Sequence, residues 1–134
     1  MEQNKVVYKK PVFYTDTHIY RDLMNFSRQV VESSKNVQVD LRKTTIQELL
    51  NDCLKTAKYI RLSYDEVLDI KRKEKYIKYI IGSLKNIEVD FNFSKDLKVF
   101  SNKTAANLSF LLGKMCSQAQ NWYISTHNKI QGKI

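Results

Sequence analysis

Glycine and proline are scarce in this chain of 134 residues, which contains three glycines and a single proline, Pro11. Tight turns between strands usually need more of both residues, so their scarcity favours long helices joined by short polar links. No apolar run approaches the length of about eighteen residues that a membrane-spanning helix needs. The first thirty or so residues also lack the apolar stretch of a secretory leader. We therefore expect an all-α, cytoplasmic protein that does not cross a membrane.

Cysteine and histidine are equally rare, with Cys53, Cys116, His18 and His127 as the only examples. A small disulfide framework needs more cysteines, so we expect two buried thiols in their reduced form. No CxxC or HxxxH spacing occurs, and we predict neither a metal site nor a cofactor. The glycine-rich loops that cradle phosphates, GxxxxGKS/T and GxGxxG, are absent too.

Asp65, Glu66 and Asp69 form an acidic cluster, and paired carboxylates are candidates for acid–base catalysis. We expect this cluster in the first turn of a helix, where the helix dipole favours negative charge and a structural role is sufficient. His18 lies four residues before Asp22, but nothing in the sequence supplies a third group to orient a base and a nucleophile. The prediction is therefore that the protein is not an enzyme.

Apolar residues recur at helical spacing in four segments. We predict a first helix over about residues 16–34, a second over about 40–62, a third from about 65, and a fourth that runs to about 126. The expected caps are Thr15 or Asp16 for the first helix and Ser101 or Asn102 for the fourth. An up-down-up-down four-helix bundle over residues 13–126 is the simplest arrangement, with a flexible basic arm before it (1–12) and a basic tail after it (127–134).

The third segment carries the clearest pattern, an apolar seam that repeats every seven residues at Ile70, Ile77, Leu84 and Phe91. This repeat predicts packing at a shallow left-handed angle. Residues 89–93 (VDFNF) alternate like a strand, but a lone strand would have no partner, so we predict helix there. In the other segments Leu54 is a predicted core residue, and Gly113 is expected where another helix approaches closely.

Positive charge is in clear excess, because 23 Lys and Arg against 14 Asp and Glu give a formal net charge of +9. Such an excess attracts polyanions. The charge does not say which polyanion is bound. Nucleic acid, RNA or DNA, is the favoured ligand, and the alternative is a charge that serves solubility alone.

Basic residues form rows on the predicted second and third helices. Lys71, Lys78 and Lys85 follow the apolar seam by one residue, which is about 100° around the helix. Tyr76 and Tyr79 are interleaved with them, and aromatic rings beside cations can stack on unpaired bases. The alternative is a solvated helix face with tyrosines at the edge of the core.

The predicted nucleic-acid contacts are Arg42, Lys43, Lys55, Lys58, Arg61, Lys71, Arg72, Lys75, Lys78 and Lys85. No motif of the kind that reads bases in a groove is present, so we expect contacts to the sugar–phosphate backbone with little base specificity.

Three short phrases resemble the accessory variability determinant proteins of diversity-generating retroelements: residues 41–46 (LRKTTI), 99–103 (VFSNK) and 118–122 (QAQNW). These proteins belong to a wider four-helix-bundle family that includes the 23S rRNA intervening-sequence proteins. The similarity covers roughly residues 12–126. The chain differs from the usual family pattern at Ile46, where a glycine tends to stand.

The resemblance implies a basic homopentamer of four-helix bundles that associates with a reverse transcriptase and its RNA and supports mutagenic cDNA synthesis. It carries Arg42 over as part of the basic surface. The alternative is a structural or ribosome-associated interaction protein without a reverse-transcriptase partner. A small enzyme that uses Asp69 or His18 is a third hypothesis.

Overall fold

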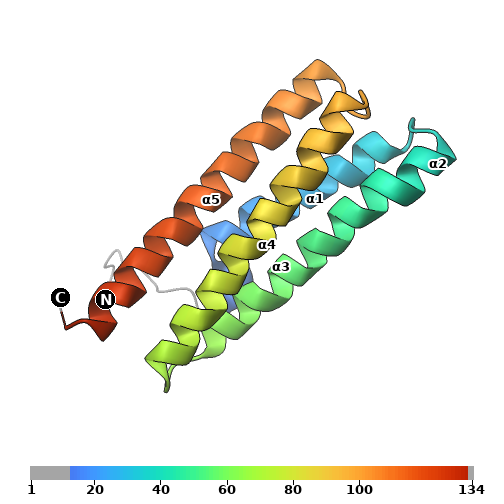
Figure 1. The fold of residues 1–134 in the computed structure, drawn as a ribbon. Coiled ribbons are helices and arrows are strands. Elements are labelled where there is room, and N and C mark those ends of the chain that lie inside the picture. Colours follow the sequence, from blue (N-terminus) through green and yellow to red (C-terminus); the bar gives the residue numbers. More distant parts are fainter. Residues whose placement is uncertain (1–12, 133–134) are drawn as a thin grey trace, which may run out of the picture.

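The structure, a computed structural model, describes residues 13–132. This part of the chain is all-helical, as predicted, and four long helices pack together in it (Figure 1). They are α1 (His18–Ser34), α3 (Gln47–Asp65), α4 (Ile70–Asp96) and α5 (Asn102–Ile130). The predicted basic arm at residues 1–12 lies outside the described residues.

The start of α1 is set by Thr17, whose Oγ1 accepts a hydrogen bond from the Tyr20 amide at 3.3 Å. A short 3-10 turn, η1 (Tyr14–Asp16), precedes this cap. The cap therefore falls one residue beyond Asp16, because Asp16 belongs to that turn and its carboxylate accepts from the Phe13 amide instead. The helix then buries one apolar face, formed by Ile19, Leu23, Phe26 and Val30.

The predicted second helix is a continuous helical segment with a π-helical turn inside it. It consists of α2 (Val39–Leu41), the π-helical turn η2 (Arg42–Ile46) and α3. In this turn the Thr45 hydroxyl donates to the Leu41 carbonyl at 2.6 Å. Hydroxyl groups that bond to the preceding turn in this way compete with the regular backbone ladder. The wider turn holds Arg42 and Lys43 at the surface.

The link between α3 and α4 contains the acidic cluster. Asp69 caps α4, because its Oδ1 accepts from the Arg72 amide at 3.1 Å. Glu66 Oε2 accepts from the Asp69 amide at 3.0 Å. The cluster therefore spans the end of α3 and the link, and not the first turn of a helix as predicted. Short polar side chains satisfy the unpaired amides at this helix start.

Residues 89–93 are helical, as we predicted against their strand-like alternation. Phe91 is 2% exposed and packs in the core, whereas Phe93 is 60% exposed. In a strand these two side chains would share a face, but in a helix they lie about 200° apart. The helix thus buries one phenylalanine and leaves the other in solvent.

α5 begins as predicted at Ser101, whose Oγ accepts from the Thr104 amide at 3.2 Å. It continues past the predicted end near residue 126, to Ile130. The last turn is held against α4 by His127 Nδ1, which lies 2.6 Å from Glu74 Oε2. The first part of the predicted basic tail, residues 127–130, is therefore helical.

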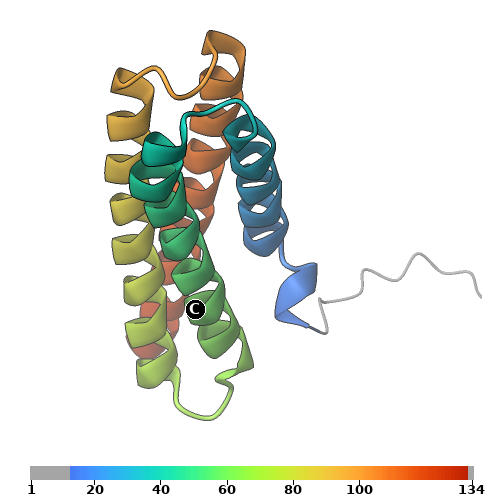
Figure 2. The ribbon, with the colours of Figure 1, turned by 90° about the vertical axis from the view of Figure 1, so that its right-hand side faces the viewer.

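Each long helix packs on two neighbours: α3 on α4, α4 on α5, α5 on α1, and α1 on α3. Figure 2 shows the α3–α4 link at one end of the molecule and the α1–α2 and α4–α5 links at the other. Phe26 of α1 and Phe91 of α4 meet in the core with their ring centroids 6.3 Å apart. α1 and α4 thus face each other diagonally across the core.

Three residues depart from their predicted environments. Leu54 is 58% exposed and Ile70 is 38% exposed, although both were predicted in the core. Ile70 is the first residue of α4, and Leu54 lies just outside the α1-facing side of α3. A Cβ added at Gly113 would meet nothing within 4 Å. The close approach of another helix that we predicted at this glycine is therefore not found within residues 13–132.

Both cysteines are free, with Cys53 buried and Cys116 half-buried. Burial is the main cause that raises the pKa of the Cys53 thiol to about 11, and the charges of Asp52 and Asp90 raise it further. Burial also raises the pKa of Cys116. Among the helices of residues 13–132, none is long and apolar enough to cross a membrane.

Candidate nucleic-acid interface

All ten predicted contact residues are exposed. Two of them lie on the π-helical turn, three on α3 and five on α4. Because α3 and α4 pack side by side, eight of the ten come from one pair of adjacent helices. Their distribution over this pair decides which of them can contact the same ligand.

The first half of α4 carries the most continuous basic surface. Lys71, Lys75, Lys78 and Lys85 follow one another along its outward side and are all exposed. They span about 21 Å at a rise of about 1.5 Å per residue. Within residues 13–132 no carboxylate pairs with any of them. We call these four residues the α4 basic row.

The α4 basic row also reaches toward α5, because Lys78 Nζ lies 5.7 Å from the centroid of the Tyr123 ring. A cation in this position is attracted by the electron-rich face of the ring. Lys78 is therefore oriented, while its ammonium group stays exposed to a ligand.

Tyr76 and Tyr79 of α4 pack at the seam with α3, which is one of the two roles that the sequence left open. The ring centroids of Tyr59 and Tyr79 lie 5.4 Å apart across the α3–α4 seam, and those of Tyr76 and Tyr79 lie 6.4 Å apart. Tyr59 and Tyr76 are half-buried, whereas Tyr79 is 41% exposed. Packing thus uses all three rings, and Tyr79 alone presents much of its surface to solvent.

Two of the predicted contacts already have acidic partners. Arg61 Nε lies 3.5 Å from Asp65 Oδ2, and Arg72 lies 3.8 Å from Glu66 and 4.0 Å from Asp69. Exposed ion pairs of this kind contribute little to stability. They do reduce the net positive charge at these two positions, so Arg61 and Arg72 are weaker candidates than the α4 basic row.

Arg42 and Lys43 lie at the opposite end of the molecule from the start of α4. In Figure 2, α2 lies at the same end of the molecule as the α4–α5 link. The ten residues therefore do not form a single compact patch. Arg42 and Lys43 lie apart from the α4 basic row. Lys55 and Lys58 lie on the adjoining helix α3, whereas the row itself approaches α5 at Lys78.

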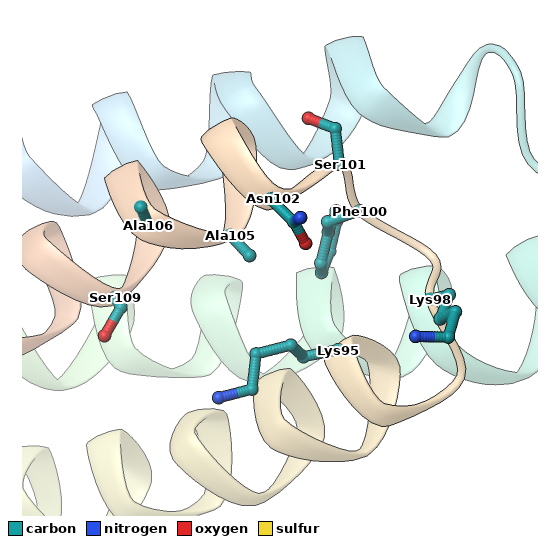
Figure 3. A pocket seen from close by; sticks show the side chains of 8 residues that line it. All are labelled: Lys95, Lys98, Phe100, Ser101, Asn102, Ala105, Ala106 and Ser109. Atoms are coloured by element: carbon teal, nitrogen blue, oxygen red, sulfur yellow. The ribbon is translucent and has the colours of Figure 1, made fainter.

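An open pocket of about 610 Å³ lies at the end of the molecule that holds Arg42 and Lys43, between the end of α4 and the start of α5 (Figure 3). Lys95 comes to it from α4 and Lys98 from the link, while Asn102 lies opposite on α5. No acidic residue lines the pocket. The start of α5 adds the positive end of a helix dipole, which favours anions.

Sequence reasoning missed Lys95 and Lys98 because they stand outside the regular rows. A signal was nevertheless present, since residues 97–134 contain five lysines and no Asp or Glu. Acidic partners for these lysines can come only from other parts of the chain. Within residues 13–132, neither Lys95 nor Lys98 pairs with a carboxylate.

Asp22, one of the groups considered for catalysis, is paired with residues of α5. Asp22 is buried and accepts hydrogen bonds from Lys114 at 3.5 Å and from Gln118 at 3.0 Å. Its carboxylate thus bonds to α5 and not to His18, which is exposed. The pairing that a base and its orienting acid would need is not formed by His18 and Asp22.

A buried polar layer between α3 and α4 was not predicted. The hydroxyl groups of Thr56 and Ser83 bond to each other, and Thr56 donates to the Asp52 carbonyl at 2.7 Å. Beside them, burial, the interaction with the Asp52 carboxyl group and the charge of Glu48 raise the pKa of Asp90 to about 7. This layer links the two helices that carry most of the predicted contacts.

No group of three His, Cys, Asp or Glu side chains in residues 13–132 is placed to hold a metal ion. Comparison of the chain with family models, with curated proteins and with solved structures found no match.

Proposed function

We propose that this chain is a non-catalytic accessory protein that binds RNA, and DNA as a second ligand, together with a reverse transcriptase in a diversity-generating retroelement. The observation that carries the nucleic-acid part is the α4 basic row, four exposed lysines on one side of a helix without acidic partners in the described part of the chain. Each lysine that neutralises a phosphate releases counterions and strengthens binding at low salt.

The proposed architecture is an up-down-up-down four-helix bundle. The links at residues 66–69 and 97–101 contain four and five residues. A link of this length reaches at most about 18 Å, less than half of the length of about 40 Å that a helix like α4 has. Short links of this kind favour antiparallel neighbours.

Exposed apolar side chains support the proposal that the chain binds a protein partner. On α4, Val89 is 68% and Phe93 is 60% exposed, and on α5, Phe110 is 67% exposed. Exposed apolar groups that gather on a surface mark protein–protein contacts. The proposed partners are further copies of this chain, in a homopentamer, and the reverse transcriptase.

The nucleic-acid proposal is tested by salt-dependent binding to a structured RNA. The variant Lys71→Gln/Lys75→Gln removes two charges from the α4 basic row. The matched control, Arg28→Gln/Lys35→Gln, removes one exposed charge from α1, the helix diagonally across the core, and one from the residue directly after that helix. We expect the slope of log affinity against log salt to fall by about 1.5 in the first variant only. An affinity that does not change with salt concentration, or an equal fall of the slope in both variants, would contradict the proposal.

The alternative function is a structural or ribosome-associated bundle without a reverse-transcriptase partner. Co-purification of a reverse transcriptase with the tagged chain, and a reverse-transcriptase gene beside near-identical repeats in the genomic neighbourhood, would favour the retroelement. A gene that lies within a ribosomal RNA insertion, with no co-purifying polymerase, would favour the alternative. Light scattering tests the assembly of five copies separately.

A further inference from the structure

A second pocket, of about 360 Å³, lies at the end of the molecule where α4 begins. It is built by the start of α1, the end of α3, the start of α4 and the last third of α5. Its lining residues include Tyr64, Lys73, Asn121 and Trp122. Pockets that bind small planar ligands have this size and combine apolar walls with a few polar groups.

Lys73 lies between two aromatic rings in this pocket. Its Nζ is 6.0 Å from the centroid of the Tyr64 ring and 5.5 Å from that of the Trp122 ring. The same Nζ donates to the Glu66 carbonyl at 3.3 Å. The lysine is thus anchored and partly withdrawn from water, where an ammonium group attracts an anion more strongly than in bulk solvent.

The charges around Lys73 come from three elements. Burial is the largest cause that lowers the pKa of Lys73, and the Lys129 ammonium on α5 lowers it further. Asp65 and Glu66, from the end of α3 and the link, act in the opposite direction. Glu66 is already paired with Arg72 and Asp65 with Arg61. Lys73, which lines the pocket, is therefore the cation that an incoming anion would meet, and the charge of Lys129 acts on the same place.

We propose that this pocket holds one unpaired base of a nucleic-acid strand, stacked on the Trp122 indole, with the adjoining phosphate between Lys73 and Lys129. The inference rests on the proposed nucleic-acid binding. Stacking on an aromatic ring beside a cation is the usual way in which single strands are bound without strong sequence preference. The side-chain amide of Asn121 can hydrogen-bond to a base edge.

The charge of the surroundings favours a nucleic acid over the chain's own N-terminal segment. Residues 1–12 contain Lys5, Lys9 and Lys10, which carry the same charge as Lys73 and Lys129. The α4 basic row begins at the same end of the bundle, with Lys71 and Lys75 on the outer side of α4 and Lys73 about 200° around the helix from them. A strand held by this row would pass around the start of α4 to reach the pocket.

Trp122 is the only tryptophan of the chain, so its fluorescence reports on this pocket alone. The probes are an end-labelled oligouridine of about twelve nucleotides and an abasic strand of the same length. Anisotropy of the label measures binding, and Trp122 fluorescence measures stacking. We expect both strands to bind through their phosphates, whereas only oligouridine quenches Trp122 and binds about tenfold more tightly.

The outcomes separate this inference from the proposed function. If both strands bind with equal affinity, and Trp122 fluorescence is unchanged or equally quenched by both, the inference that the pocket holds a base is wrong. Binding through the phosphate backbone then still stands. Failure of both strands to bind overturns the pocket and counts against the proposed function as well.

Variants localise the effect to the pocket. Lys73→Met keeps the length of the side chain and removes its charge, and we expect it to abolish the preference for oligouridine over the abasic strand. Lys71→Met is the matched control on the outer side of α4 and should weaken both strands equally. If Lys73→Met does not fold by circular dichroism, Asn121→Ala at an exposed position replaces it. A preference that survives in the folded pocket variant overturns the inference.

Discussion

The carboxyl group of Asp90 in α4 lies beside that of Asp52 in α3, in a pair of helices that is otherwise joined by apolar contacts and two hydroxyl groups. Burial, the interaction with the Asp52 carboxyl group and the charge of Glu48 raise the pKa of Asp90 from 3.8 to about 7. The folded protein therefore holds a proton that the unfolded chain releases at lower pH. Its stability must depend on pH over this interval.

Asp90→Asn should remove this pH dependence. In the native chain the favourable contribution of Asp90 is complete below its unfolded pKa of 3.8 and is lost as the pH rises to about 7. An asparagine amide is uncharged at every pH, so this loss does not occur in the variant. We expect the variant to gain about 1 kcal/mol over the native protein between about pH 5 and about pH 8, after discounting for the partial exposure of Asp90.

Urea unfolding at several pH values measures the Asp90→Asn effect. Asp96→Asn is the control, because Asp96 is exposed at the end of the same helix. A stability difference that does not change with pH would contradict the raised pKa of Asp90.

Phe91 and Phe93 should respond very differently to the same substitution. Phe91→Ala leaves a cavity in the core beside Phe26 and Phe100 and is expected to cost about 3–5 kcal/mol of unfolding free energy. Phe93→Ala removes a side chain that is 60% exposed and should cost about 0.5 kcal/mol or less. Similar costs for both variants, measured by urea unfolding, would contradict the helical phase of residues 89–93.

Gly82→Ala and Gly113→Ala should each stabilise the fold. Both glycines lie inside helices, and a Cβ at either position would meet nothing within 4 Å. Alanine is expected to add about 0.5–1 kcal/mol to the unfolding free energy. Gly132 is the contrasting control, because its φ of +69° makes alanine unfavourable there. If helices of two subunits packed against each other at Gly113, Gly113→Ala would weaken the assembly. Light scattering would then show a lower mass for this variant alone.

Lys95→Gln/Lys98→Gln should weaken binding to a structured RNA if the pocket in Figure 3 contacts phosphate. The slope of log affinity against log salt should fall by about 1.5, as for two lost phosphate contacts. The variant Arg28→Gln/Lys35→Gln again controls for net charge. An unchanged slope would confine the interface to the α3–α4 side of the molecule.

Local signals predicted the helices well, and they failed where a residue lies at the edge of an apolar face. The periodicity of residues 70–96 correctly favoured helix over the strand-like VDFNF, because the buried residues repeat with the helical period. The same reasoning placed Leu54 in the core, where it is 58% exposed. The width of a buried face depends on where the neighbouring helices sit, and the sequence of one helix does not contain that information.

Only part of the candidate interface could be predicted, and the reason is related. The exposure of the ten basic residues follows from their positions on amphipathic helices. Their acidic partners do not all follow from local spacing, because the pairing of Arg72 with Glu66 needs the link to fold back toward α4. Lys95 and Lys98 were missed because a pocket forms only where the end of one helix meets the start of the next.

The amino-acid sequence by itself determined the all-helical character of this protein, the side of each helix that faces the core and the excess of positive charge. Those properties depend on residues within a few helical turns of one another, so each helix shows them independently of how it packs on the others. Only the tertiary structure brought Asp52 beside Asp90 and set Lys73 between Tyr64 and Trp122. Residues far apart along the chain become neighbours through the packing of whole helices, and that packing decides their pKa values and the ligands they can meet.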